Sequence, residues 1–122
     1  VYKRQVLELA DPAVASPLTL VESHAAVAAA HRNSHLSDGE LTSALNILAL
    51  AWEQIDRVAL TGETADRAAT LAHIHALSGA DAVHLATAPD LGDPELVLAT
   101  WDRRLHAAAQ AEGLAVAPAS LD

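Results

Sequence analysis

The stretch Glu95–Val116, ELVLATWDRRLHAAAQAEGLAV, decides the fold class. Its near-continuous apolar run, Leu96–Thr100, is typical of a strand that is buried on both faces. A helix is predicted over Arg103–Glu112, with Gly113 just past its end, where glycine is favoured. Leu114–Val116 then predicts a last strand. A strand, a helix and a strand in this order indicate an α/β fold with a parallel sheet that is covered by helices.

The predicted strand Leu96–Thr100 ends next to an acidic residue, Asp102. In open parallel sheets, ligands bind beyond the carboxyl ends of the strands. We therefore expect Asp102 to lie at a functional site. An alternative interpretation is that Asp102 caps the helix that begins at Arg103. Spacing alone does not separate the two.

The remainder of the chain is predicted to be mostly helical. Ser37 followed by Glu40 is a capping box, which marks a helix start. Ser16 before Pro17 marks another. The predicted helices are Leu18–Arg32, Asp38–Ile55, Glu63–Leu77 and Ala80–Pro89, and short strands are predicted at Val14–Ala15 and Arg57–Leu60.

Two further carboxylates interrupt apolar helix faces. In SGADAVHLATA, Asp81 shares a face with Leu85 and Ala88. In LTLVESHAAVAAAHR, Glu22 shares a face with Leu18, Ala25 and Ala29. The alternatives are that Asp81 caps its helix and that Glu22 reaches the rim of its face to pair with an arginine.

Buried carboxylates need a partner, since an unpaired one costs several kcal/mol by order of magnitude. A cluster of them also repels itself unless a cation intervenes. Hard divalent cations such as Mg²⁺ take oxygen ligands and keep several waters. Glu22, Asp81 and Asp102 are therefore candidate ligands for a metal ion that acts on a phosphodiester.

Composition narrows the class of protein. The chain has 122 residues, suited to one domain, and no cysteine, which fits a reducing cytoplasm. Its formal net charge of −9 counts against a simple nucleic-acid binder, and less against a metal enzyme, because the cation offsets clustered carboxylates. No apolar run reaches the roughly 20 residues that span a bilayer, so we expect a cytoplasmic protein without a membrane partner.

Three blocks resemble the PIN domain in its VapC toxin branch: LTLVESHAAVAAAHR, GADAVHLATA and LVLATWDRRLHAAAQAEGLAVAP. The resemblance implies a three-layer α/β fold, with a parallel sheet flanked by helices, and a Mg²⁺- or Mn²⁺-dependent endoribonuclease of a toxin–antitoxin system. By motif match it makes Glu22, Asp81 and Asp102 the catalytic metal ligands. Thr100 matches a hydroxyl position near the site. The implied partners are RNA, a cognate antitoxin with a basic segment, and a second copy of the chain through the first two helices.

The beginning of the chain departs from the family pattern, which opens with an apolar strand ending in Asp and then a helix. Asp11 is followed by Pro12, and we do not assign it to the site. We expect residues 1–5 to be a non-native extension and residues 6–122 a single PIN-like domain that lacks its first strand and first helix. An inactive PIN fragment that serves only as a protein-interaction domain is the alternative to an enzyme. A DNA-directed nuclease of the same fold is a third reading.

Other side chains near the predicted site have weaker signals. Arg103 could bind a phosphate of the substrate, or it could pair with nearby acids as Arg104 is expected to do. His106 is expected at the helix surface. Trp101 could stack a base, but a wedge in the alanine-rich core is the preferred interpretation.

Overall fold

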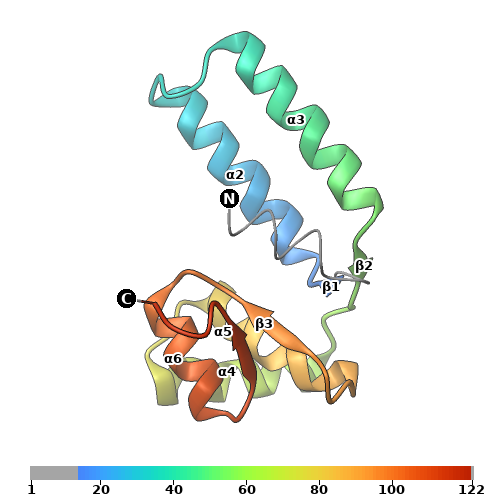
Figure 1. Ribbon diagram of the computed structural model, residues 1–122, viewed down its shortest axis with the longest axis vertical. Helices are drawn as coiled ribbons and strands as arrows, with labels where there is room; N and C mark the ends of the chain where they lie inside the picture. Colours follow the sequence, from blue (N-terminus) through green and yellow to red (C-terminus); the bar gives the residue numbers. More distant parts are fainter. Residues whose placement is uncertain (1–13, 122) are drawn as a thin grey trace. The chain divides into compact units, whose positions relative to one another are not determined.

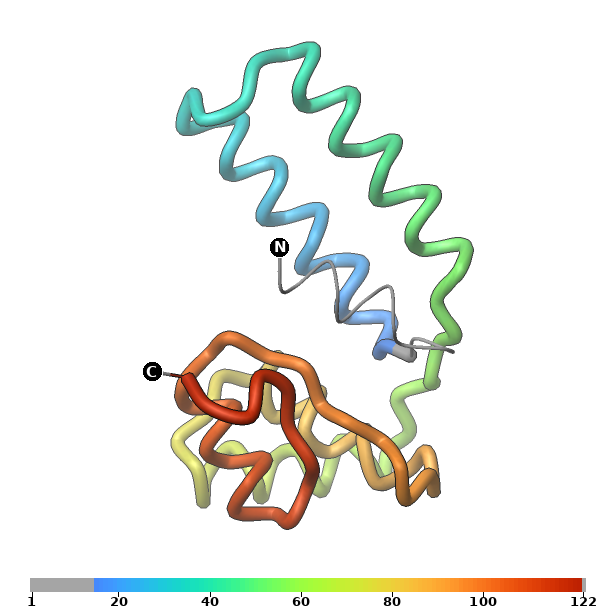
Figure 2. The backbone as a smooth tube through the Cα atoms, in the orientation of Figure 1, coloured from blue at the N-terminus to red at the C-terminus, as the bar shows by residue number. Residues whose placement is uncertain are grey.

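The computed structural model describes residues 14–121 (Figures 1 and 2). The predicted extension at residues 1–5, and Asp11, lie outside this range. The chain forms two compact units, one containing the described residues up to Val58 and the other those from Ala59 onward. Within the described range, no helix combines the length and the apolar character that a membrane crossing requires.

The first unit is a helical hairpin on a short strand pair (Figure 1). The strands β1 (Val14–Ala15) and β2 (Asp56–Arg57) pair in parallel. Between them the chain runs out along α2 (Leu18–Arg32) and returns along α3 (Asp38–Glu53). The second strand therefore forms one residue before the predicted Arg57–Leu60. Its pairing continues through the N–H of Val58, which donates to the carbonyl of Ala15 at 3.1 Å.

Local capping explains where the two helices of the hairpin begin. The hydroxyl of Ser16 accepts the N–H of Leu18 at 3.3 Å. The hydroxyl of Ser37 accepts the N–H of Glu40 at 3.1 Å, and the carboxylate of Glu40 accepts the N–H of Ser37 at 3.0 Å. The predicted capping box is thus confirmed. These hydrogen bonds, led by the one from the Ser37 backbone, hold the pKa of Glu40 below its ordinary value.

The second unit contains the strand–helix–strand motif on which the fold prediction depends. The strands β3 (Val97–Ala99) and β4 (Ala115–Ala117) pair in parallel, and α6 (Arg103–Ala111) connects them. Before them the chain forms α4 (Gly62–His75), α5 (Gly79–Thr87) and the 3₁₀ helix η1 (Ala88–Leu91). The α/β class with parallel strands is confirmed, and the described strands form two separate pairs rather than one continuous sheet.

The core of the second unit lies where α4, α5 and α6 meet. Alanine dominates it, which lets the helix backbones approach closely. Leu85 is the largest apolar side chain that is almost fully enclosed, with 1% exposed. The core residues are Ala68, Leu77, Ala82, Leu85, Ala86, Leu105, Ala108 and Ala109, and Leu98 and Val116 of the sheet pack against them.

Two predictions about burial are wrong. The strand β3 is not buried on both faces, because Val97 is 50% exposed and only Leu98 turns toward the core. Trp101 is 37% exposed and does not wedge the core. In the second unit the core is instead filled by small alanines and by leucines such as Leu85 and Leu105, and Val97 and Trp101 are not part of it.

Candidate active site

Asp102 lies just after β3 and caps α6. Its Oδ1 accepts the N–H of Leu105 at 2.9 Å, and its backbone is extended, as an N-cap requires. The capping interpretation is therefore correct in geometry. It does not compete with metal binding, because the cap uses one carboxylate oxygen and Oδ2 has no hydrogen-bond partner within residues 14–121.

Thr100 holds the backbone of Asp102 in place. The hydroxyl oxygen of Thr100 accepts the N–H of Asp102 at 3.1 Å, and the N–H of Thr100 donates to the carbonyl of Ala117 at 3.0 Å. The Thr100 side chain is buried. The sheet edge, the threonine and the acid therefore form one continuous set of hydrogen bonds.

Asp81 stands in the first turn of α5, and it is not the helix cap. Ser78 is the cap, because its hydroxyl accepts the N–H of Asp81 at 3.2 Å. Asp81 is half-buried, and Ala82 and Leu85 of the same helix are enclosed. The Asp81 carboxylate has no hydrogen-bond or ion-pair partner in the described part of the chain, and it stands in the first helical turn, where a negative charge is favoured.

One hydrogen bond links the chain segments that carry the two aspartates. Arg104, in the first turn of α6, donates from Nη1 to the carbonyl of Ala76 at 3.3 Å. Ala76 ends α4 in a left-handed conformation, φ 52°, two residues before the Ser78 cap. The start of α6 thus lies beside the turn that leads into α5. The predicted pairing of Arg104 with nearby acids is replaced by this contact.

Glu22 lies on α2, in the first unit, and its side chain is exposed. The apolar stripe predicted around it is not buried, because Leu18 and Ala29 are only half-buried and Ala25 is exposed. Neither helix of the hairpin has a buried residue. The metal-binding role of Glu22 stays a prediction from the motif.

The donor chemistry of Asp81 and Asp102 fits a hard divalent cation. Both offer carboxylate oxygens without a protein partner within residues 14–121, and Mg²⁺ is usually held by one or two carboxylates together with waters and substrate phosphates. Within the same range, no group of three or more His, Cys, Asp or Glu side chains is close enough to hold a metal ion. Asp81 and Asp102 belong to the second unit and Glu22 to the first.

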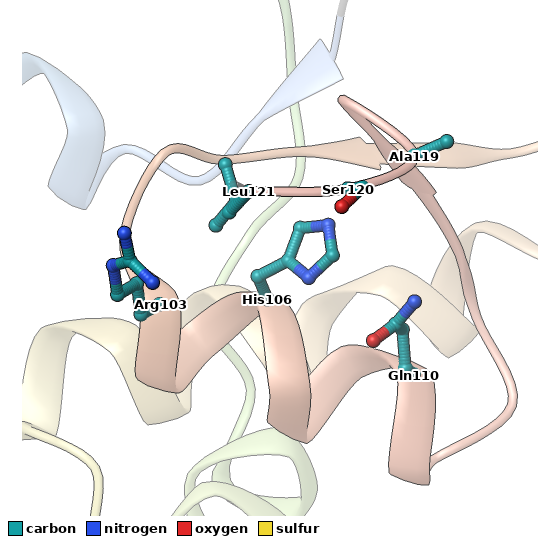
Figure 3. Close-up of a pocket in the computed structure, with 6 residues that line it drawn as sticks. All are labelled: Arg103, His106, Gln110, Ala119, Ser120 and Leu121. Carbon is teal, nitrogen blue, oxygen red and sulfur yellow. The ribbon is translucent and has the colours of Figure 1, made fainter.

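Arg103 and His106 line one side of an open pocket of about 270 Å³ (Figure 3). Arg103 is exposed at the start of α6. His106 is 6% exposed, so its predicted surface position is wrong. Its Nε2 lies 2.7 Å from the carbonyl oxygen of Pro118. Because a carbonyl only accepts, Nε2 carries the proton and donates.

A second polar network was not predicted from the sequence. Asp90 accepts hydrogen bonds from the Thr64 hydroxyl and from the Arg67 guanidinium, which also donates to the carbonyl of Ala86 at 3.1 Å. The Thr64 hydrogen bond is the main cause that holds the pKa of Asp90 below its ordinary value, although partial burial opposes it. The network ties α4 to the end of α5, and its members are too far apart in sequence to form a motif.

Comparison with known proteins agrees with the predicted resemblance. The family model of the PIN domain matches residues 2–111, which include all the candidate site residues. Ribonuclease VapC45 of Mycobacterium tuberculosis (strain CDC 1551 / Oshkosh) is 50% identical over 112 residues, covering 92% of this chain and 78% of that protein. Ribonuclease VapC49 of strain ATCC 25618 / H37Rv matches with the same identity and coverage.

Proposed function

The chain belongs to the PIN domain family, and from this premise we propose that it is a metal-dependent endoribonuclease, the toxin of a toxin–antitoxin pair. The observation that carries the proposal is 50% identity, over 92% of the chain, to two proteins named ribonucleases. The position of Asp102 beyond β3, at the edge where α/β sheets bind ligands, supports it.

We infer that Asp81, Asp102 and Glu22 hold Mg²⁺ or Mn²⁺. A divalent ion supplies a more acidic bound water and offsets the charge that develops on a phosphodiester. Within residues 14–121, Oδ2 of Asp102 and the carboxylate of Asp81 make no hydrogen bond or ion pair, which supports this assignment. The contribution of Glu22 rests on its match to the family motif alone.

The surrounding residues orient these acids rather than react. The Thr100 hydroxyl accepts the backbone N–H of Asp102 and the N–H of Leu105 donates to Oδ1, so the orientation of the second carboxylate oxygen is restricted. The Ser78 cap fixes the first turn of α5, on which Asp81 stands. The Arg103 guanidinium, one residue beyond Asp102, is suited to bind a phosphate oxygen of the RNA. Preorganisation of this kind keeps reacting groups in place without a cost at the moment of reaction.

The acidic character of the chain suits a basic protein partner. With 16 acidic and 7 basic residues, the chain has a net charge of −9. A partner segment carrying Arg or Lys would meet complementary charge, whereas free RNA meets repulsion away from the metal. We infer that the antitoxin supplies such a segment, and that both partners act in the cytoplasm.

We also infer a homodimer through the helical hairpin. Val21 of α2 is 63% exposed, and Ile47 and Leu50 of α3 are 65% and 63% exposed. Contiguous apolar patches on a protein surface mark interaction sites, and the two hairpin helices leave these three large apolar side chains exposed. Burying these three side chains against a second copy would remove them from water.

The first test is cleavage of mixed small RNAs by the purified chain with Mn²⁺. We expect cleavage that disappears in EDTA and with Asp81→Asn. The control Asp66→Asn removes an exposed carboxylate from α4, outside the site, and is expected to cleave normally. Mn²⁺ should also raise the melting temperature of the wild type, because a ligand that binds only the folded state stabilises it, and Asp81→Asn should reduce that rise. If the wild type cleaved none of the RNAs, the chain would be a protein-interaction domain without enzymatic activity.

A further inference from the structure

The pocket beside the candidate site is formed by one face of α6 and the chain segment that follows β4. Arg103, His106 and Gln110 stand three and four residues apart, so they share one helical face. Figure 3 shows their side chains on the side of α6 that faces Ser120 and its neighbours. The hydrogen bond from His106 to the carbonyl of Pro118 fastens this segment to the helix.

The lining of the pocket is suited to an anion. Arg103 is the one fully charged side chain among the described residues that line it, and none of these residues carries a carboxylate. This contrasts with a chain whose net charge is −9. The side chains of Arg103, Gln110 and Ser120 make no hydrogen bond within residues 14–121, so their donors are available to a ligand.

The size and place of the pocket limit what the anion can be. Its volume of about 270 Å³ lies below the roughly 300–1,000 Å³ of pockets that enclose a whole small molecule. The pocket is open to solvent. Arg103, which lines it, directly follows Asp102 in the segment after β3. From Arg103 to Gln110 the helix rises about 10 Å. A pocket of this size has room for one group of a ligand and not for a whole small molecule.

We propose that this α6 pocket binds a backbone phosphate of the RNA, one that neighbours the phosphodiester being cut. Arg103 would supply the charge, and Gln110 and Ser120 would supply neutral donors. His106 acts as a positioning residue. Its Nε2–H donates to the carbonyl of Pro118 and so holds the segment after β4, which lines the pocket opposite α6. The proposal rests on the proposed ribonuclease function and adds a contact that selects for substrates longer than a dinucleotide.

Two measurements test the pocket. The first is the affinity of the full chain for a labelled single-stranded RNA of ten nucleotides. It is measured by fluorescence anisotropy in EDTA at several salt concentrations. We expect Arg103→Gln to weaken binding about tenfold and to lower the salt slope by about 0.7, the value for one phosphate contact on a single strand. Gln110→Ala should weaken binding about threefold with the slope unchanged. Arg32→Gln, which removes an exposed charge from the end of α2, is the matched control and should have a smaller effect.

The second measurement is cleavage with Mn²⁺ by wild type and Gln110→Ala. On the ten-nucleotide RNA we expect KM to rise about threefold with kcat unchanged, and on a dinucleotide with a single phosphodiester we expect no difference. Equal weakening by Arg32→Gln, or wild-type affinity in both pocket variants, would overturn the proposal. A wild type that binds RNA through the pocket but never cleaves it would instead count against the ribonuclease function alone.

Discussion

The buried hydroxyl of Thr100 accepts the backbone N–H of Asp102 at 3.1 Å, which couples the end of the sheet to the candidate metal ligand. Thr100→Val keeps the shape and removes the acceptor of that N–H, at a cost of about 1 kcal/mol, the usual net contribution of one hydrogen bond. We expect a lower melting temperature and a several-fold lower kcat for RNA cleavage, because Asp102 loses one of its two restraints.

Thr87→Val is the matched control for this change. Thr87 is also buried, and its hydroxyl donates to the carbonyl of Val83 at 2.7 Å within α5. Its loss is expected to alter stability modestly and to leave kcat unaltered. If the two variants lost activity in proportion to their loss of stability, the Thr100 hydroxyl would have no role in orienting the acid.

Asp102 combines a structural and a chemical role, and two substitutions separate them. Asn caps helices as well as Asp does, so Asp102→Asn should retain the hydrogen bond to Leu105 and most of the stability. Asp102→Ala removes the cap and should cost about 1 kcal/mol. Both are expected to abolish cleavage, measured with Mn²⁺ beside thermal unfolding. Wild-type cleavage by Asp102→Asn would show that this residue is only a cap.

The sequence was most informative where local rules decide the structure. The capping box of Ser37 and Glu40 follows from residues three apart, and the strand–helix–strand order of β3, α6 and β4 follows from periodicity and from Gly113. Asp102 could be placed for the same reason, since the end of a parallel strand is a position that the pattern itself defines.

The sequence was less informative wherever contacts are distant along the chain. The hydrogen bond between Arg104 and Ala76 joins residues 28 apart, and that between Thr64 and Asp90 joins residues 26 apart, so no spacing rule anticipates either. The burial of His106 was not predicted for a similar reason, because its hydrogen-bond partner, Pro118, follows β4 in the sequence. The apolar run also led to an overestimate of the burial of Val97. Such a run shows which residues are apolar, but not how many of them the core can cover.

If the hairpin forms the proposed homodimer, substitutions in its exposed face should lower the molecular mass in solution without changing the fold. Ile47→Glu together with Leu50→Glu places two charges on the exposed face of α3, where no buried residue is disturbed. We expect analytical ultracentrifugation to show a shift from dimer to monomer, with the helical circular dichroism retained. Leu60→Glu, at a residue that is 51% exposed but outside the hairpin, is the control and should stay dimeric. A dimer that survives the double substitution would place the interface elsewhere.

Asp90 predicts how stability depends on pH. Its folded-state pKa is lowered from 3.8, first by the Thr64 hydrogen bond and then by Arg67. A lowered pKa adds stability that is fully present above the unfolded value and is lost as pH falls through the folded value. Asp90→Asn should therefore melt below the wild type at neutral pH, and the difference should shrink as the pH falls below about 4.

Thr64→Val should reproduce part of this effect, because it removes the largest cause of the lowered pKa. Thr70→Val, an exposed threonine on the same helix, serves as the control. A difference between Asp90→Asn and wild type that stayed constant from neutral to acidic pH would mean that the carboxylate charge contributes nothing to the network.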